Sequence, residues 1–336
     1  MRENIQRFLE EIKIGARQSH GNMTLYCVLK AEDADVDFMG LDEALDRSAI
    51  SITELDEAGS VRELRVTNKS DRKVLMLDGE ELVGAKQNRV LNVSVLIAPN
   101  SETIIPVSCV ERGRWSYRSR EFGSAGRAMS PDLKRKKTRS VSDSLRSTGS
   151  FESAQGMVWQ EIDAKFDRLA EKRSPTMALS DLYDAQRDRS EEYLKAFRTV
   201  DFQIGMVVFI DNKLAGVELL DKYDAFRRSH SKLVQSYAMD AIETALQEIT
   251  AESKSRKARA VNILEQTADA IVETRKSVAL GEDIRLESED VIAAGLEFEG
   301  RVLQLSIFPK DEYDHPGRRK SSMSAASRRR DSVVSS

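Results

Sequence analysis

The stretch LMLDGEELVGAKQNRVLNVSVLIAPNSETIIPVSCVERGRW, Leu75 to Trp115, decides how the rest of the chain is interpreted. Its runs of Val, Leu and Ile predict β-strands, and turn residues such as APNS separate them. Between two apolar runs the chain places a group of charged and amide side chains, and Gly79 and Gly84 permit sharp backbone turns among them. Charge at this density inside a strand-rich region requires either internal pairing or a ligand.

The first third of the chain continues this pattern of short strands. Repeated runs at this spacing favour an antiparallel sandwich or a strongly bent sheet. The expected strands are residues 23–29, 50–55, 63–68, 74–79, 89–98 and 102–110, with a short helix at 41–45.

The middle of the chain changes character after Trp115. Residues 117–127 are rich in Arg, Ser and Gly and predict an exposed loop, and Ser130 followed by Pro131 is a helix start. Residues 127–146 contain seven Lys or Arg against two Asp, a net charge of +5. This segment is either a solvated helix face or a surface for an anionic ligand or partner.

Helices and strands mix in the last part of the chain. A helical stripe around Trp159 is followed by an expected helix over 179–197 and a hairpin whose turn is Asp211-Asn212-Lys213. Two helices, ending near Ile249 and Ile271, precede three closing strands over 283–308. The order of elements predicts an α+β fold rather than regular βαβ units.

We expect one large α+β domain over residues 1–310. Its β-rich part covers about 14–115, a basic loop and helix about 116–150, and a mixed part about 151–310. Residues 311–336 are rich in Ser and Arg with almost no core-forming side chains, which predicts a disordered tail.

Composition limits the class of protein. The net charge of −4 argues against a protein that coats nucleic acid, although local basic segments could bind it. No apolar run approaches the roughly 20 residues that span a bilayer, and the first residues lack the apolar core of a secretory signal. Two cysteines suit reduced thiols, so we expect a soluble, cytoplasmic protein. Three histidines argue against a histidine-built metal centre, and the sequence leaves the cofactor unknown.

The chain contains no Walker A loop, G-x-G-x-x-G, G-x-S-x-G or CxxC motif. Candidate chemistry therefore rests on polar residues at strand ends. The acid/base candidates are Glu80, Glu81 and Glu218, and the ligand-binding candidates are Lys86, Gln87, Asn88, Arg89, Glu111, Arg114 and Trp115. Arginine binds phosphate while an indole offers a stacking face for a base.

The alternative for each candidate is a structural role. The acids and bases of residues 78–89 could form an ion-paired network, and Glu218 lies in an apolar strand where it needs a partner if buried. Cys109 has no histidine nearby in sequence, which favours a buried structural thiol over a nucleophile.

Four strings carry a family resemblance: residues 77–115, WQEI at 159–162, GMVVFIDNKLAGVELLD at 205–221 and KLVQSYAMDAI at 232–242. In this order, from about Ile14 to Pro309, the chain resembles the ARG and Rhodanese-Phosphatase-superfamily-associated Protein domain. The resemblance implies a place in ADP-ribose or nucleotide-related metabolism, with ADP-ribosylglycohydrolase or phosphatase pathway partners. It also implies a polar residue, often His, where this chain has Gln304, so a role for that position as a base is in doubt here.

Two hypotheses follow. In the first, the candidate residues converge in one pocket that binds, and hydrolyses or modifies, a phosphorylated small molecule such as ADP-ribose. In the second, the chain is a non-catalytic structural or protein-interaction module whose charges are paired internally. The first requires the groups to open onto one cleft, and the second requires them to be mutually paired and sealed.

Overall fold

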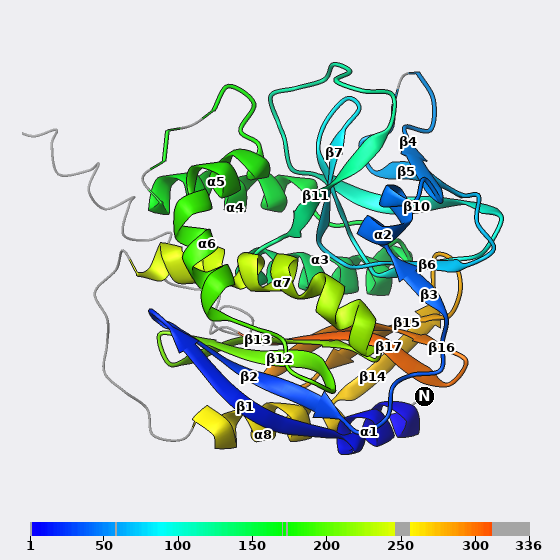
Figure 1. Ribbon diagram of the computed structural model, residues 1–336. Coiled ribbons are helices and arrows are strands. Elements are labelled where there is room, and N and C mark those ends of the chain that lie inside the picture. The colour runs from blue at the N-terminus through cyan, green and yellow to red at the C-terminus, as the bar shows by residue number, and fades with distance from the viewer. Residues whose placement is uncertain (1, 58, 170, 173, 246–255, 311–336) are drawn as a thin grey trace, which may run out of the picture.

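The largest element of the computed structural model, which describes residues 2–57, 59–169, 171–172, 174–245 and 256–310, is an eight-stranded antiparallel sheet (Figure 1). Its order is β1-β2-β12-β13-β17-β16-β15-β14. The strands are β1 (Ile12–His20), β2 (Met23–Lys30), β12 (Gln203–Ile210), β13 (Lys213–Leu220), β14 (Ile271–Lys276), β15 (Glu282–Glu287), β16 (Val291–Phe298) and β17 (Arg301–Pro309).

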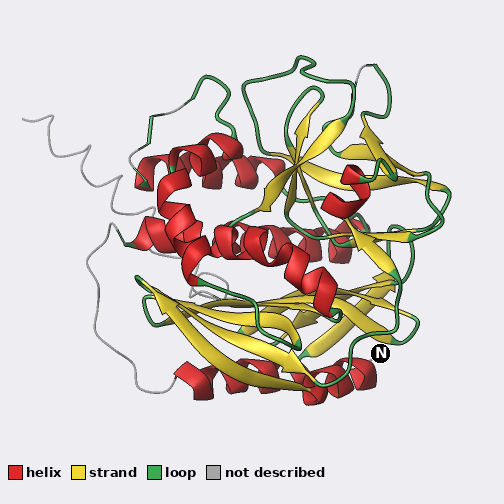
Figure 2. Cartoon of the chain, viewed as in Figure 1, coloured by secondary structure: helices red, strands yellow, loops and turns green. Residues whose placement is uncertain are grey.

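Both faces of the central strands are covered, which explains their near-continuous apolar runs. All eight residues of β12 are buried. Helices α1 (Arg2–Glu11) and α8 (Arg256–Ala268) pack on one face, and the 22-residue helix α7 (Tyr223–Thr244) packs on the other (Figure 2). The predicted hairpin is confirmed, because Asp211 and Asn212 adopt the positive φ values of a tight turn between β12 and β13.

Two smaller sheets lie beyond α7 and hold most of the opening stretch of sequence. The six-stranded sheet has the order β11-β7-β8-β10-β5-β4, and the three-stranded sheet has the order β3-β6-β9. The strands are β3 (Phe38–Gly40), β4 (Ile50–Thr53), β5 (Glu63–Asn68), β6 (Lys73–Met76), β7 (Glu80–Gly84), β8 (Arg89–Leu91), β9 (Val95–Ile97), β10 (Ser101–Cys109) and β11 (Phe122–Ala128).

The remaining helices lie between or beside the sheets (Figure 1). They are α2 (Leu41–Asp46), α3 (Pro131–Thr148), α4 (Gln155–Arg168), α5 (Leu179–Ala185) and α6 (Arg187–Ala196). A β-rich N-terminal region, helices in the middle and a closing sheet confirm the α+β fold. One difference is that β1 and β2 join the large sheet beside β12 rather than the smaller sheets.

Several element boundaries differ from the prediction. The single strand expected over 89–98 is two strands, β8 and β9, in different sheets, because Asn92 and Ser94 bind partners outside the ladder. The helix expected over 179–197 is interrupted at Gln186, which has φ −103° and ψ 16°. The expected loop over 117–127 includes most of β11, and Ile271 begins β14, 71% exposed, instead of ending a helix.

One of the two interpretations of the basic segment was a solvated helix face. The structure shows that α3 is not solvated along its whole length. It starts at Pro131 after Ser130 as predicted, and its apolar stripe is buried, but so are Lys134, Arg135 and Lys137. Each of these three cations forms an ion pair with an acid. The expected tail, residues 311–336, lies outside the described residues.

Candidate functional site

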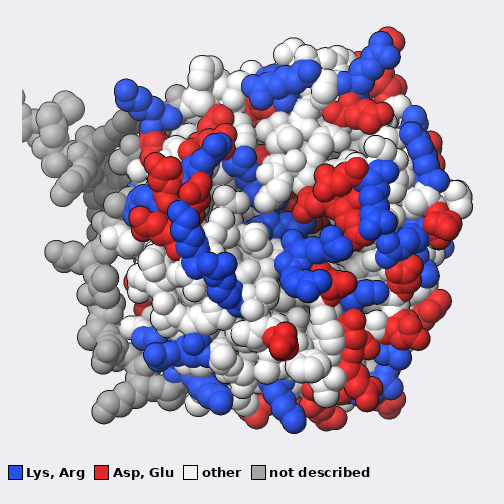
Figure 3. Space-filling model, in the orientation of Figure 1, with Lys and Arg blue, Asp and Glu red and all other residues white. Residues whose placement is uncertain are grey.

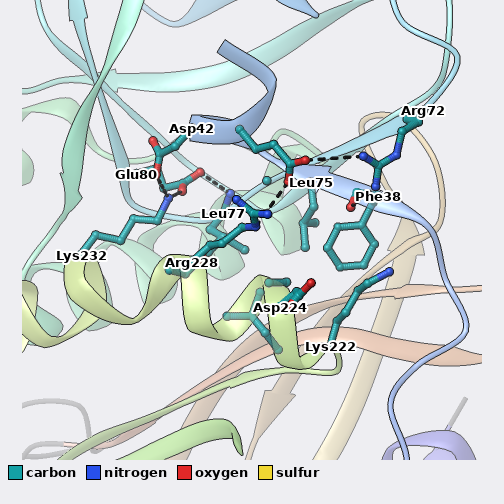
Figure 4. A pocket seen from close by; sticks show the side chains of 15 residues that line it. Phe38, Asp42, Arg72, Leu75, Leu77, Glu80, Lys222, Asp224, Arg228 and Lys232 are labelled. Atoms are coloured by element: carbon teal, nitrogen blue, oxygen red, sulfur yellow. Dashed lines mark hydrogen bonds and ion pairs between the residues drawn. The ribbon is translucent and has the colours of Figure 1, made fainter. Parts of the chain in front are cut away.

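A pocket of about 250 Å³ lies where the first turns of α7 meet α2 and the ends of β6 and β13 (Figure 4). Part of its lining is apolar, and most of the rest consists of cations and acids in equal number. The apolar side chains are Phe38, Leu75, Leu77, Leu220 and Ala225; the cations are Arg72, Lys222, Arg228 and Lys232; the acids are Asp42, Glu43, Glu80 and Asp224; Gly40 and Ser229 complete the lining. An apolar surface with a few convergent polar groups is typical of a small-molecule site.

A buried ion pair forms part of the pocket. Lys232 of α7 donates a hydrogen bond to Glu80 and another, of 2.8 Å, to Asp42 (Figure 4). The side chains of Lys232 and Glu80 are only 6% and 2% exposed. Burial alone would lower the pKa of Lys232, but Glu80 and Asp42 raise it above its ordinary value. Glu80 and Asp42 therefore favour the charged form of the lysine, while burial raises the pKa of the Glu80 carboxyl.

The local sequence explains how Glu80 reaches this position. Gly79 has φ +82°, a conformation that L side chains rarely adopt, and it directs the chain from β6 into β7. The Glu80 carboxylate closes this turn by accepting a 2.7 Å hydrogen bond from the Leu77 amide. Because successive side chains of a strand point to opposite faces, Glu80 faces the pocket and Glu81 faces away.

Two arginines form the charged wall of the pocket. Arg72 donates to Asp37 at 2.5 and 2.9 Å, and this ion pair lowers the pKa of Asp37. Its remaining terminal nitrogen, Nη1, lies 3.5 Å from Glu43, and Nε of Arg228 lies 3.6 Å from the same carboxylate. Figure 4 marks both contacts with dashed lines.

Glu81 lies on the opposite face of β7 and is fully buried. Neither of its oxygens accepts a hydrogen bond of normal geometry from the described residues, and the Arg127 guanidinium is 3.9 Å away. Burial raises the pKa of Glu81 to about 7, and Arg127 and Asn88 offset only part of this effect. Glu81 is thus a buried acid that titrates near neutral pH.

Glu111 and Arg114 form a bidentate ion pair, in which Arg114 donates hydrogen bonds of 2.9 and 2.7 Å to the carboxylate. Arg114 also donates to the carbonyls of Ala85, Gly84 and Ser116, and Glu111 accepts the Asn88 amide at 3.0 Å. These contacts join residues 84–88 to residues 111–116. The Arg114 guanidinium therefore directs its hydrogen bonds to groups of the protein itself.

Lys86, Gln87, Arg89 and Trp115 form a separate cluster. The Lys86 amine lies 5.3 Å from the centre of the half-exposed Trp115 ring, and the buried Arg89 guanidinium lies 5.6 Å from it. Gln87 accepts hydrogen bonds from Arg89 at 2.9 Å and from the Cys109 thiol at 3.0 Å. Burial raises the pKa of Cys109 to about 11, so the thiol stays protonated at neutral pH.

Glu218 belongs to a buried polar network between the large sheet and α3. It accepts hydrogen bonds from Lys134 at 2.9 and 3.0 Å and from Ser306 at 2.5 Å. Four further hydrogen bonds extend the network. Gln304 donates to Ser306, Ser94 donates to Gln304, the Asp78 amide donates to Ser94, and Lys137 donates to Asp78. Burial lowers the pKa of Lys137 to about 8. Gln304, the position that the family resemblance singled out, is therefore a link in this network.

The structure thus divides the predicted site residues among several places. Of the three acid/base candidates only Glu80 lines the pocket, whereas Glu81 is buried 3.9 Å from Arg127 and Glu218 is paired with Lys134. Glu111, a ligand-binding candidate, is paired with Arg114. Sequence reasoning missed Arg72, Arg228 and Lys232. Helical spacing was an available signal for part of this set, because positions 225, 228, 229 and 232 share one face of α7 and all line the pocket.

The chain matches the profile of the ARG and Rhodanese-Phosphatase-superfamily-associated Protein domain over residues 11–308. It belongs to this family. The family match includes the pocket and the buried network alike. A comparison with curated proteins and one with solved structures gave no match.

Across residues 2–310, leaving out the gaps named above, no helix has the length and apolar character needed to cross a membrane. Within the same residues, no group of three or more His, Cys, Asp or Glu side chains is arranged to hold a metal ion.

Proposed function

We propose that the pocket binds a small phosphorylated molecule of the ADP-ribose or nucleotide type. The observation that carries the proposal is the convergence of Arg72, Arg228 and Lys222 around an apolar surface, with Lys232 and Glu80 buried beside it. A guanidinium group suits phosphate because it can donate two parallel hydrogen bonds, which Arg228 could do here. Arg72 would offer Nη1 alone, since Asp37 holds its Nε and Nη2. The first turn of α7 also lines the pocket, and a helix N-terminus favours an anion.

The volume indicates which part of such a ligand would enter. Pockets for drug-sized ligands are about 300–1,000 Å³, and this one is about 250 Å³. A ribose phosphate group suits this space better than a complete dinucleotide. Acidic and basic side chains alternate over the face shown in Figure 3, so the arginines would act locally rather than as part of a broad basic surface.

A titration of ADP-ribose, ribose 5-phosphate and ADP, followed by calorimetry, tests the proposal. Arg228→Ala removes an exposed side chain whose nearest acid is 3.6 Å away, so we expect an intact fold and at least tenfold weaker binding. Arg187→Ala is the matched control, since Arg187 is an exposed helix arginine with an i,i+3 ion pair outside the pocket. Equal binding by both variants would exclude this pocket.

A second candidate is a hydrolytic or group-modifying reaction on the same ligand. The buried contact of Glu80 with Lys232 favours it, because a carboxylate next to a held cation can exchange a proton with a bound molecule. The pairing of Glu111 with Arg114 and of Glu218 with Lys134 favours the other alternative, a non-catalytic module. Product analysis after incubation with ADP-ribose separates the two.

A further inference from the structure

Three arginines converge on the single carboxylate of Glu43, in the first turn of α2. Arg47, the residue that follows α2, forms an i,i+4 ion pair with Glu43, and its Nη2 lies 2.9 Å from Oε1. Nη1 of Arg72 lies 3.5 Å from the same oxygen, and Nε of Arg228 lies 3.6 Å from Oε2. An acid in the first turn of a helix is favourable by itself, but that effect does not explain three guanidinium groups around it.

The three contacts are not equivalent. Only the Arg47 contact is a hydrogen-bond distance, whereas those of Arg72 and Arg228 are longer than a charge-assisted hydrogen bond of about 2.7–2.9 Å. Both of these pocket arginines therefore face the carboxylate without being fully satisfied by it. Arg47 is not part of the pocket lining, so it holds Glu43 from outside.

We propose that Glu43 stands in for the ligand's phosphate between Arg72 and Arg228, and that phosphate binding displaces its carboxylate toward Arg47. This inference rests on the proposed function, because it concerns the same pocket. Arg47 makes the exchange feasible, since Glu43 keeps a cationic partner after the pocket arginines have turned to the ligand. A phosphate brings more charge and more acceptor oxygens than the carboxylate that it replaces.

The remaining charges near the exchange stay paired. Arg72 keeps Asp37, which holds Nε and Nη2 and leaves Nη1 for the incoming anion. Lys232 keeps Glu80 and Asp42. Only the partners of Glu43 need to change, so the residue acts as a competitor that sets the affinity of the pocket.

A double-mutant cycle on Glu43 and Arg47 tests the inference, with inorganic phosphate and ADP-ribose as separate probes. Glu43→Gln removes the competing charge while keeping the shape, so we expect at least fivefold tighter binding. Arg47→Ala removes the outside partner, leaves Glu43 to the pocket arginines and should weaken binding two- to fivefold. In the Glu43→Gln background the Arg47 substitution should have no effect.

The outcomes separate the two ideas. If ADP-ribose binding depends on Arg228 but Glu43→Gln leaves it equal or weaker, Glu43 is no competitor and only the proposed function survives. If inorganic phosphate binds more tightly to Glu43→Gln while ADP-ribose does not bind at all, the inference stands and the proposed ligand is wrong. Absence of binding of either probe to wild type and to Glu43→Gln overturns both. Unchanged melting temperatures of the three variants confirm that the fold is intact.

Discussion

Two buried lysine–glutamate pairs in this molecule are similarly buried but have different surroundings. Lys232 and Glu80 are 6% and 2% exposed, and Lys134 and Glu218 are both 4% exposed. Each lysine comes from a helix, and each glutamate comes from a strand. The first pair borders a pocket with two arginines beside it, whereas the second is enclosed by Ser306, Gln304 and the core.

Burial and pairing of an acid therefore do not by themselves identify a functional site. A sealed pair has all its hydrogen-bonding capacity used by the protein, so its removal affects stability. A pair next to a cavity leaves one side for a ligand, so its removal should affect binding more than stability. The following variants test this difference.

The largest effect is expected for Glu218→Gln, in the sealed pair. Without the carboxylate charge, Lys134 stays buried with only neutral partners, and breaking a buried ion pair in this way costs about 3–5 kcal/mol. Urea denaturation measures the loss, and ADP-ribose binding should not change. Glu282→Gln, on an exposed strand position, is the control and should shift stability by less than about 0.5 kcal/mol. If the Glu218→Gln variant is stable but binds ADP-ribose more weakly, the functional site lies in the buried network instead of the pocket.

A smaller effect should appear in the pH dependence of stability through Glu81. Its folded pKa of about 7 lies above the unfolded value of 4.5, so the folded state binds more protons between these values. Stability must then fall as pH rises, by about 2–3 kcal/mol between pH 5 and pH 8 from this group. In Glu81→Gln this component disappears, so the variant gains on wild type as the pH increases. Parallel stability profiles for the two proteins would show that Glu81 keeps an ordinary pKa.

Glu80→Gln, in the pair beside the pocket, should cost less stability than Glu218→Gln. Lys232 retains Asp42 at 2.8 Å, so we expect a loss of about 1 kcal/mol. Binding of ADP-ribose should fall about tenfold, which equals about 1.4 kcal/mol. Calorimetry and urea denaturation of the same preparation give both values. If the variant loses as much stability as Glu218→Gln and binds normally, the two pairs are equivalent and the comparison fails.

Deletion of residues 311–336 should have the smallest effect. The family match ends at residue 308, and the last described strand, β17, ends at Pro309. We expect the melting temperature and the binding of ADP-ribose to stay within error of the full chain. A loss of several degrees on thermal denaturation would show that the tail contributes to the folded state.

Local sequence signals predicted much of the fold. The hairpin of β12 and β13 could be recognised because Asp211 and Asn212 favour its turn, and β5 has the predicted limits. The break between β8 and β9 could not be recognised, because it depends on partners far along the chain. Ser94 binds Gln304, 210 positions away, and Lys137 binds the carbonyl of Asn92.

The site was predictable only in part, for a related reason. The sequence drew attention to Glu80, but adjacent residues of a strand face opposite sides, so Glu81 could not share its pocket. Lys134 and Lys137 belong to a basic segment whose net positive charge predicted side chains that face solvent or bind an external anion. Their partners are Glu218, in β13, and Asp78, in the turn between β6 and β7, and no local pattern connects them.

The position of β2 between β1 and β12 has a consequence for the folding of the chain. One edge of β2 pairs with β1 and the other edge pairs with β12. The edge that pairs with β12 stays unpaired until residues 203–210 have been synthesised. At about 5–20 residues per second, the interval of on the order of 170 residues takes roughly 10–35 s. An unpaired, apolar strand edge is a template for association with other chains. Products truncated before β12 should therefore aggregate, whereas the complete chain covers the edge itself.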